Sequence, residues 1–252
     1  MIGGGESDML LPVVISRPPH ACPRPAPAPL PAALPVARPL ARAPGRRRVA
    51  ATPPVGCRFD AVVAQIVAQP RSSASRIAKR VVDVIVSAIA LVALSPLLVV
   101  LALAVKLTSR GPSLFVQDRC GLGGRRFRFY KLRTMVSNAE DCKAALVHLN
   151  EMTGPVFKIR RDPRITAIGR VLRKLSLDEL PQLWNVLRGD MSLVGPRPPT
   201  PDEVARYTPR HAQRLSVMPG ITGLWQVSGR NDIRDFERWI DLDLEYARTW
   251  SV

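Results

Sequence analysis

Metal-binding and disulfide-forming side chains are scarce in this sequence. The 252 residues include four cysteines and three histidines. No two cysteines form a C-x-x-C pair, and their spacings match no zinc pattern. This usage predicts reduced thiols rather than a disulfide framework. His20, His148 and His211 are too scattered to suggest a catalytic triad or a metal cluster, so each is interpreted as a structural or surface residue.

Acidic side chains are also in short supply. The chain holds 20 Asp and Glu residues against 37 Lys and Arg residues, which gives a formal net charge of +17. Such a charge attracts polyanions, either nucleic acid or the surface of an anionic phospholipid membrane. No helix-turn-helix, zinc or RNA-recognition motif is present. A basic, membrane-associated nucleic-acid-binding protein is therefore an alternative hypothesis without a motif to support it.

Amphipathic periodicity is missing from the first part of the chain. The stretch PRPAPAPLPAALPVARPLARAPGRRR is built from proline, alanine and arginine. Its prolines prevent a regular helix or a central strand, and its composition is typical of disordered segments. The sequence therefore predicts a disordered Pro/Ala/Arg-rich extension over residues 1–75.

Charge is absent from a long apolar run that follows this extension. The 22 residues from Val84 to Val105 carry no charged side chain. As a straight helix they would measure about 33 Å, enough for a hydrocarbon core of about 30 Å. Residues 76–110 are therefore predicted to form a membrane helix.

Two features argue that this helix enters the membrane without crossing it. Ser95 and Pro96 stand at its midpoint, where proline removes a backbone hydrogen bond and bends a helix. A serine hydroxyl or nearby backbone could donate hydrogen bonds to the carbonyls that proline leaves unpaired. Lysine and arginine flank both ends, and such residues favour the cytoplasmic side. On the residues alone, a re-entrant helix–break–helix and a kinked span remain equal alternatives.

The remaining residues, 111–252, are predicted to fold as a small domain of helices and a β-hairpin, so the fold class is α+β. SLFVQDR and RFRFYKLR read as two strands joined by the turn GLGG. Residues 162–190 read as helix, break and helix, ended by Gly189. A proline-rich loop, a short helix and a strand through ITGLWQVSGRN follow. The last helix carries an apolar stripe at Phe236, Ile240, Leu244 and Ala247.

Two adjacent carboxylates, Asp178 and Glu179, stand out in a chain that is poor in acids. One interpretation is structural, because Ser176 to Glu179 matches the S-x-x-E capping box and acids complement a helix dipole. The other is chemical. One carboxylate could attack phosphorus, and the other could hold Mg²⁺, which would offset the repulsion between an anionic nucleophile and a diphosphate. Five basic side chains nearby could grip phosphate: Lys131, Arg133, Arg173, Lys174 and Arg197.

Four segments in this order resemble the bacterial sugar transferases, which are monotopic phosphoglycosyl transferases. They are KRVVDVIVSAIALVALSPLLV, YKLRTM, DPRITAIGRVLRKLSLDELPQLWNVLRGDMSLVGPRP and PGITGLWQVSGRN, and the resemblance covers about Arg76 to the C-terminus. It implies transfer of a sugar 1-phosphate from a UDP-sugar to undecaprenyl phosphate, with release of UMP. The transfer would be the first membrane step of exopolysaccharide, capsule or O-antigen synthesis.

The resemblance also implies a role for each matching residue. Asp178 corresponds to the nucleophile that forms a phospho-aspartyl intermediate, and Glu179 to its Mg²⁺-binding partner. Arg173 corresponds to an arginine that contacts phosphate, and Lys131 and Arg133 to a basic pair at phosphate or substrate. The P-R-P motif associated with nucleotide recognition corresponds to Pro196, Arg197 and Pro198.

The family's re-entrant helix breaks at a Ser-Pro pair, which corresponds to Ser95 and Pro96. This correspondence implies the bacterial inner membrane, with the catalytic domain on its cytoplasmic face. It also implies downstream glycosyltransferases as candidate partners and no nucleic acid. The chain resembles the small single-domain form of the family.

Family sequences run on past YARTWS, so the C-terminus at Val252 is expected to be truncated. A truncated or degenerate copy that acts as a non-catalytic assembly scaffold is therefore a further alternative. The motifs leave open whether glucose, galactose or an N-acetylated hexosamine derivative is transferred.

Overall fold

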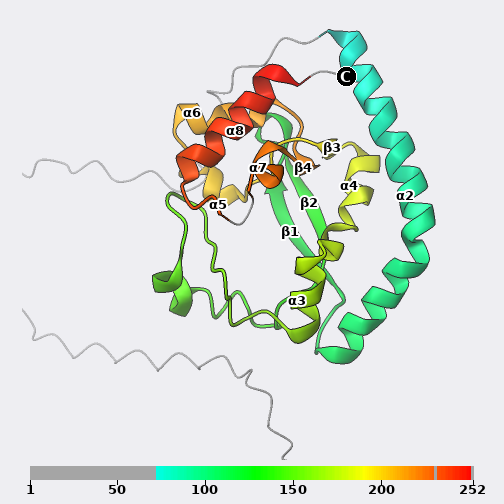
Figure 1. Cartoon of the computed structure of the whole chain (residues 1–252), viewed down its shortest axis with the longest axis vertical. Helices are drawn as coiled ribbons and strands as arrows, with labels where there is room; N and C mark the ends of the chain where they lie inside the picture. The colour runs from blue at the N-terminus through cyan, green and yellow to red at the C-terminus, as the bar shows by residue number, and fades with distance from the viewer. Residues whose placement is uncertain (1–71, 230–231, 251–252) are drawn as a thin grey trace, which may run out of the picture.

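The structure is a computed structural model that describes residues 72–229 and 232–250 (Figure 1). Helices dominate it, and two small sheets lie among them, which confirms the predicted mixture of helix and strand. The proposed extension over residues 1–75 falls almost entirely outside the described residues. Its last residues are helical, because the first described helix begins at Ser73 rather than at Arg76.

The long helix α2, Ser73–Thr108, lies along one side of the domain and bows around it (Figure 1). It packs against α3, α4 and β3. By length and composition it is the one helix in the described residues that could cross a membrane. Its outward side is apolar, and the following residues are each more than half exposed: Ile89, Val92, Val99, Val100 and Leu103.

The predicted break in this helix is not confirmed, because α2 continues through Pro96 as a helix. The Ser95 hydroxyl donates a hydrogen bond of 2.8 Å to the Val92 carbonyl. This is the carbonyl four residues before Pro96, which the proline nitrogen cannot serve. The serine therefore replaces the missing bond, and the helix continues through Pro96.

Polar contacts hold the first half of α2 to the domain. Arg80 donates to the carbonyls of Val186 and Leu187 at 2.5 and 2.8 Å, at the C-terminal end of α4. Asp83, which is buried, accepts a hydrogen bond from the Leu193 backbone N–H at 3.0 Å. These contacts join groups that are more than a hundred residues apart in the sequence, and they fix how α2 lies on the domain.

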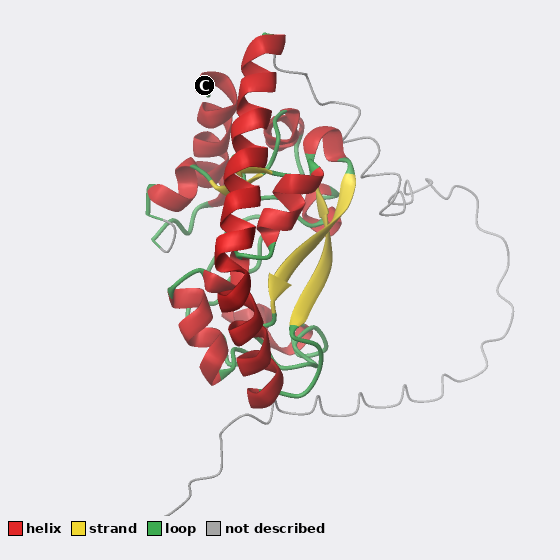
Figure 2. Cartoon of the chain, turned by 90° about the vertical axis from the view of Figure 1, so that its right-hand side faces the viewer, coloured by secondary structure: helices red, strands yellow, loops and turns green. Residues whose placement is uncertain are grey.

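The predicted hairpin is present. Strands β1, Leu114–Cys120, and β2, Arg126–Leu132, pair antiparallel and are seen side by side in Figure 2. The short 3₁₀ turn η1, Leu122–Gly124, joins them, and Gly123 there has a φ of 61°, which glycine adopts without strain. The register pairs Leu114 with Leu132 at one end of the hairpin and Cys120 with Arg126 at the other.

Helix, break and helix follow as predicted, after the 3₁₀ turn η2, Ala144–Leu149. Helix α3 spans Ala167–Lys174 and α4 spans Gln182–Arg188, which ends at Gly189 with a φ of 83°. The capping box predicted at Ser176 is wrong. Ser176 lies in the left-handed region and makes no side-chain cap bond, and the Asp-Glu pair lies in a separate 3₁₀ turn, η3, Leu177–Glu179.

A second sheet pairs β3, Ser192–Val194, with β4, Gly220–Thr222, in parallel. A Cβ on Gly220 would lie 2.0 Å from the Gly195 nitrogen, so the two chains approach as only glycine permits. The strand predicted through ITGLWQVSGRN is shorter than expected, because only Gly220–Thr222 forms a strand. It is followed by helix α7, Leu224–Val227.

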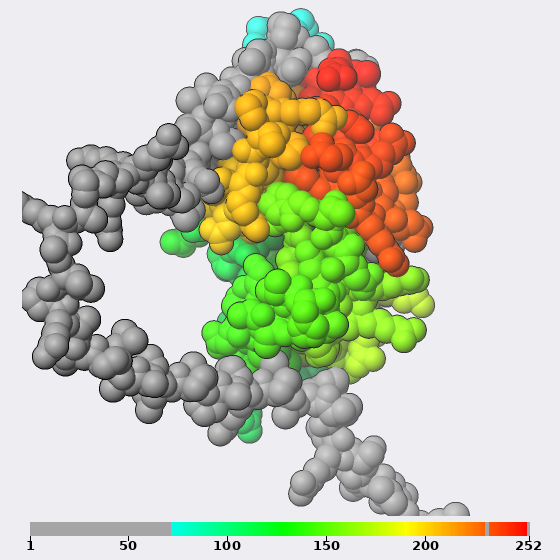
Figure 3. Space-filling view, turned by 90° about the vertical axis from the view of Figure 1, so that its left-hand side faces the viewer, coloured from blue at the N-terminus to red at the C-terminus, as the bar shows by residue number. Residues whose placement is uncertain are grey.

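The largest core cluster lies under the C-terminal helix α8, Phe236–Thr249. All four residues of the predicted apolar stripe are buried. Trp239 of α8 stacks on Trp225 at 4.1 Å between ring centroids. Figure 3 shows α8 against the segment that contains α5, Pro201–Val204, and α6, Pro209–Ala212.

The cysteine prediction is half correct. Cys120 is a buried free thiol, as expected, whereas Cys142 is disulfide-bonded. The error has a simple cause: spacing along the sequence does not say which cysteines meet in space.

We predict that Arg80→Met loosens α2 from the domain, because two carbonyls at the end of α4 lose a charged donor. The free energy of unfolding in detergent should fall by about 1.5–3 kcal/mol, measured by circular dichroism during denaturation. Arg76→Met is the matched control, since Arg76 lies one turn earlier and bonds only the Ser73 hydroxyl of its own helix, at 3.4 Å. Equal losses in the two variants would contradict the anchoring role.

Candidate active site

The carboxylate pair lies in the turn η3, between α3 and α4, at the centre of the domain. Asp178 is 5% exposed and Glu179 is 9% exposed. Leu177 packs against a cluster formed by Val105 of α2 and Leu172 of α3. The apolar anchor beneath the turn therefore fixes the position of the two acids that follow it.

Two opposing influences act on the Asp178 carboxyl. Burial raises its pKa above the usual range, and the adjacent Glu179 charge raises it further. Three cations act in the opposite direction: Lys131, Arg173 and Arg197. Oxygen Oδ1 of Asp178 is buried and has no hydrogen-bond partner among the described residues. A buried carboxylate oxygen facing cations but bonded to none is suited to bond a phosphorus centre or a metal.

Each of the three cations comes from a different part of the chain. Lys131 lies on β2, Arg173 on the last turn of α3, and Arg197 on the loop after β3. Arg197 Nη1 lies 3.4 Å from Glu179 Oε1. Arg173 Nε donates to the Thr134 hydroxyl at 2.9 Å. The structure therefore brings together Asp178, Glu179 and three of the basic residues predicted from the sequence.

Lys131 has the most altered pKa among these cations. Its ammonium lies 5.1 Å from the centroid of the Phe115 ring. Burial, together with the positive charges of Arg173, Arg197 and Arg119, lowers the pKa of Lys131 to about 7, although the charge of Asp178 opposes the shift. The lysine therefore carries its full charge only when the pH is below neutral or an anion is bound beside it.

The position of Arg173 depends on a close approach between α3 and the end of β2. A Cβ on Gly169 would lie 2.0 Å from the Thr134 carbonyl oxygen. The Thr166 backbone N–H donates to the same carbonyl at 3.0 Å, just before α3 begins. Only glycine at 169 allows this contact, so one small residue sets where α3 and its arginine lie.

The P-R-P segment is held through its backbone. Gly220 N donates to the Pro196 carbonyl at 2.9 Å. Arg119 Nη1 donates to the Pro198 carbonyl, also at 2.9 Å. The two prolines therefore shape the loop, while the side chain of Arg197 is the part that reaches the acids.

Arg133 lies apart from the predicted site. Its guanidinium donates to both the carbonyl and the hydroxyl of Ser109, each at 2.8 Å, at the C-terminal end of α2. It is not among the charges that act on Asp178. The structure places Arg133 as a tie between the hairpin and α2, where it satisfies a helix-end carbonyl.

Three polar residues near the site were not found by sequence reasoning: Arg119, Gln182 and Arg214. Arg119 is buried against Phe129 and holds the P-R-P loop. Gln182, in the first turn of α4, is 2% exposed, and its Nε2 has no hydrogen-bond partner in the described part of the chain. Arg119 and Gln182 lie in segments that the sequence predicts to be a strand and a helix. A local sequence pattern does not show that a polar side chain is buried, so neither residue stood out.

A cavity of about 250 Å³ opens beside Glu179. It lies between α4 and β4, and most of its lining is apolar. The residues around it are Ser176, Glu179, Leu180, Leu183, Ile221, Thr222 and Gln226. Glu179 is thus accessible from a space large enough for part of a small-molecule substrate, and Asp178 adjoins it in the chain without lining the cavity.

The residues present fit a magnesium ion only in combination with a substrate. No group of three or more His, Cys, Asp or Glu side chains is gathered for a metal within residues 72–229 and 232–250. Mg²⁺ keeps few protein ligands and is bound through one or two carboxylates together with substrate phosphates. The single carboxylate of Glu179, beside the proposed nucleophile Asp178, matches that donor set once substrate phosphates supply further oxygens.

Comparison with known proteins shows which family the chain belongs to. The sequence model of the bacterial sugar transferase family matches residues 74–252. The chain is 56% identical over 142 residues to the galactosyl transferase CpsE of Streptococcus agalactiae serotype III, which is 56% of this chain and 32% of CpsE. It is 44% identical over 182 residues to an undecaprenyl-phosphate galactose phosphotransferase of Salmonella typhimurium, covering 71% of this chain and 38% of that protein.

A shorter relative is covered over about four fifths of its length. The exopolysaccharide production protein ExoY of Sinorhizobium fredii is 42% identical over 180 residues, which is 70% of this chain and 79% of ExoY. By contrast, the chain spans less than two fifths of CpsE and of the Salmonella protein. The matched region contains α2, the hairpin and the carboxylate pair. This chain therefore belongs to the bacterial sugar transferase family.

Proposed function

We propose that this protein transfers a sugar 1-phosphate from a UDP-sugar to undecaprenyl phosphate. The observation that carries the proposal is the buried Asp178, with one oxygen unbonded, beside Glu179 and among three cations. The relatives support the substrates. Their names include undecaprenyl-phosphate galactose and glucose phosphotransferases and a UDP-glucose:undecaprenyl-phosphate glucose-1-phosphate transferase.

In the first step, an Asp178 carboxylate oxygen attacks the β-phosphorus of the UDP-sugar. The bond between that phosphorus and the oxygen bridging to the α-phosphorus breaks, and UMP leaves with the bridging oxygen. The sugar phosphate remains on Asp178 as an acyl phosphate. Arg173, Arg197 and protonated Lys131 neutralise the diphosphate during the attack, since preorganised cations stabilise developing charge.

In the second step, a phosphate oxygen of undecaprenyl phosphate attacks the same phosphorus. The bond to Asp178 breaks, which restores the carboxylate and releases the lipid-linked sugar diphosphate. Glu179 would hold Mg²⁺, whose positive charge would stabilise the negative charge on the phosphate oxygens. The lipid-linked product is a substrate for downstream glycosyltransferases, in keeping with the relatives named as exopolysaccharide production proteins.

The location we propose is the cytoplasmic face of the bacterial inner membrane, with α2 entering the bilayer and returning to the same face. Two observations support the re-entrant arrangement. Both halves of α2 contact the same domain, through Arg80 and Asp83 at one end and Val105 at the other. The opposite side of the helix is apolar and exposed. A helix that crossed the bilayer would carry one of its ends away from the domain.

The test is UMP release by detergent-solubilised protein supplied with Mg²⁺, undecaprenyl phosphate and a panel of UDP-sugars. We expect Asp178→Asn and Glu179→Gln each to lower the rate by about a thousandfold or more, because catalytic groups that act as a unit fail together. The matched control is another adjacent acidic pair, Glu140 and Asp141, which is exposed.

Glu140→Gln and Asp141→Asn should keep the wild-type rate. Full activity in Asp178→Asn would contradict the assigned nucleophile. A wild-type protein that releases no UMP with any sugar would favour the scaffold alternative. The active sugar in the panel would identify the donor.

The lowered pKa of Lys131 predicts a pH dependence of donor binding. Below about pH 7 the folded protein holds a charged Lys131, and above it the charge is lost, so KM for the UDP-sugar should rise with pH. Lys131→Arg keeps its charge and should flatten this rise. Lys143→Arg is the control, because Lys143 also faces an aromatic ring, Phe157, at 5.8 Å. The same pH slope in wild type and Lys131→Arg would contradict this role for Lys131.

A further inference from the structure

The most deeply buried charges of the domain lie away from the carboxylate pair. Arg214, on the 3₁₀ turn η4, Gln213–Ser216, faces Asp243 of α8 with Nη2 and Oδ2 2.5 Å apart. Each side chain is 1% exposed. Removing two charges from water costs more than a buried ion pair commonly returns, so stability alone does not explain such a pair. The contacts of the Arg214 guanidinium explain why the buried pair is present.

The Arg214 guanidinium joins four parts of the chain. Nη1 donates to the Tyr207 hydroxyl at 2.8 Å, and the guanidinium carbon lies 5.4 Å from the centroid of the Trp239 ring. Nη2, which pairs with Asp243, also donates to the Arg197 carbonyl at 3.0 Å. A planar fork of donors can satisfy several partners at fixed angles, which a lysine cannot do. The core pair is thus connected to the P-R-P loop.

Arg197 is the residue at which this connection meets the active site. Its backbone carbonyl is held by Arg214, and its side chain lies 3.4 Å from Glu179. The carbonyls on either side, of Pro196 and Pro198, are held by Gly220 and Arg119. Three consecutive carbonyls are therefore fixed from three different elements, and the central one depends on α8 through a buried charge.

We propose that Arg214 is a positioning residue, which Asp243 on α8 orients so that it fixes the backbone of Arg197 and aims that arginine at Glu179 and the donor diphosphate. This inference rests on the proposed function. It gives α8 a role in donor binding, although the helix contributes no side chain to the carboxylate pair. Replacing Arg214 should act on donor binding only through Arg197.

The charge state of the pair agrees with this role. Burial raises the pKa of Asp243, and the Arg214 charge opposes the rise, which leaves the pKa at about 6. At neutral pH the carboxylate is therefore ionised opposite the guanidinium. The attraction that orients Arg214 is present under the conditions in which the enzyme would work.

A double-mutant cycle separates positioning from ordinary core packing. Wild type, Arg214→Lys, Arg197→Met and the double variant are compared by KM and kcat for the UDP-sugar, and by calorimetric binding of UDP. We expect Arg214→Lys to raise KM and the Kd for UDP about tenfold with a smaller change in kcat. In the Arg197→Met background the same change should have no further effect. Circular dichroism confirms that each variant is folded.

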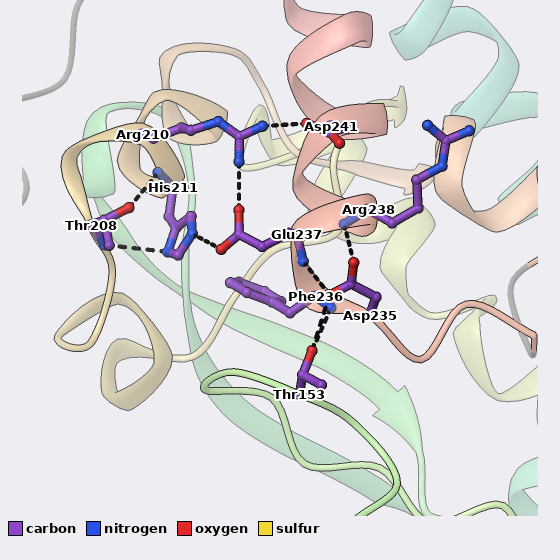
Figure 4. Close-up of polar contacts among 9 residues, drawn as sticks. All are labelled: Thr153, Thr208, Arg210, His211, Asp235, Phe236, Glu237, Arg238 and Asp241. Carbon is purple, nitrogen blue, oxygen red and sulfur yellow. Dashed lines mark hydrogen bonds and ion pairs between the residues drawn. The ribbon is translucent and has the colours of Figure 1, made fainter.

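Two further variants keep the test decisive. Tyr207→Phe removes one partner of Arg214 without changing a charge, so it should raise KM about threefold, again only when Arg197 is present. Arg210→Met is the matched control. Arg210 also joins the chain near η4 to α8, through Glu237 and Asp241, but these contacts are exposed and do not reach Arg197 (Figure 4). It should keep the wild-type KM.

The outcomes distinguish this inference from the proposed function. Suppose that the wild type releases UMP and that the effects of Arg214→Lys and Arg197→Met on KM multiply in the double variant. That result would overturn the positioning role and leave the proposed function standing. A wild type that binds UDP without releasing UMP would overturn the proposed function, and the UDP-binding cycle would still decide the role of Arg214. A wild type that binds no UDP would overturn both.

Discussion

The arrangement of this domain depends on keeping two adjacent carboxylates away from water in one short turn. Burial and mutual repulsion both disfavour the ionised form of Asp178, and the cations of β2, α3 and the P-R-P loop make it tenable. Oxygen Oδ1 of Asp178 is left without a hydrogen-bond partner among the described residues. An oxygen in this position is suited to react with a phosphate group. The same cations would also neutralise the negative charge of that phosphate.

The balance is maintained by parts of the chain that lie outside the site. Gly169 lets α3 approach Thr134, so Arg173 lies beside the turn. Val105, near the end of α2, packs on the same apolar cluster as Leu177, just before the carboxylates. The long helix is therefore both the most apolar helix among the described residues and a wall of the domain that holds the carboxylate pair. A membrane-embedded acceptor would meet the reacting phosphate next to this helix.

Local patterns predicted much of the fold but not the long-range polar contacts. The hairpin, the two helices around the carboxylates and the stripe on α8 follow from alternation, helical period and Gly189. The capping box failed because Ser176 adopts a left-handed conformation, which no pattern signals. Pro96 did not break α2 because a serine hydroxyl took over its bond. Arg119 and Arg214 bond carbonyls that are 79 and 17 residues away in the sequence, so their roles appear only in the folded chain.

The central claim is that Asp178 bonds covalently to phosphorus, and mass spectrometry tests it most directly. The protein would be quenched after brief reaction with the active UDP-sugar and Mg²⁺, without undecaprenyl phosphate, and then digested. We predict a sugar-phosphate adduct on the peptide that contains Asp178, which added undecaprenyl phosphate removes and which Asp178→Asn never forms. Stoichiometric UMP release without an adduct, or an adduct that persists in Asp178→Asn, would contradict the claim.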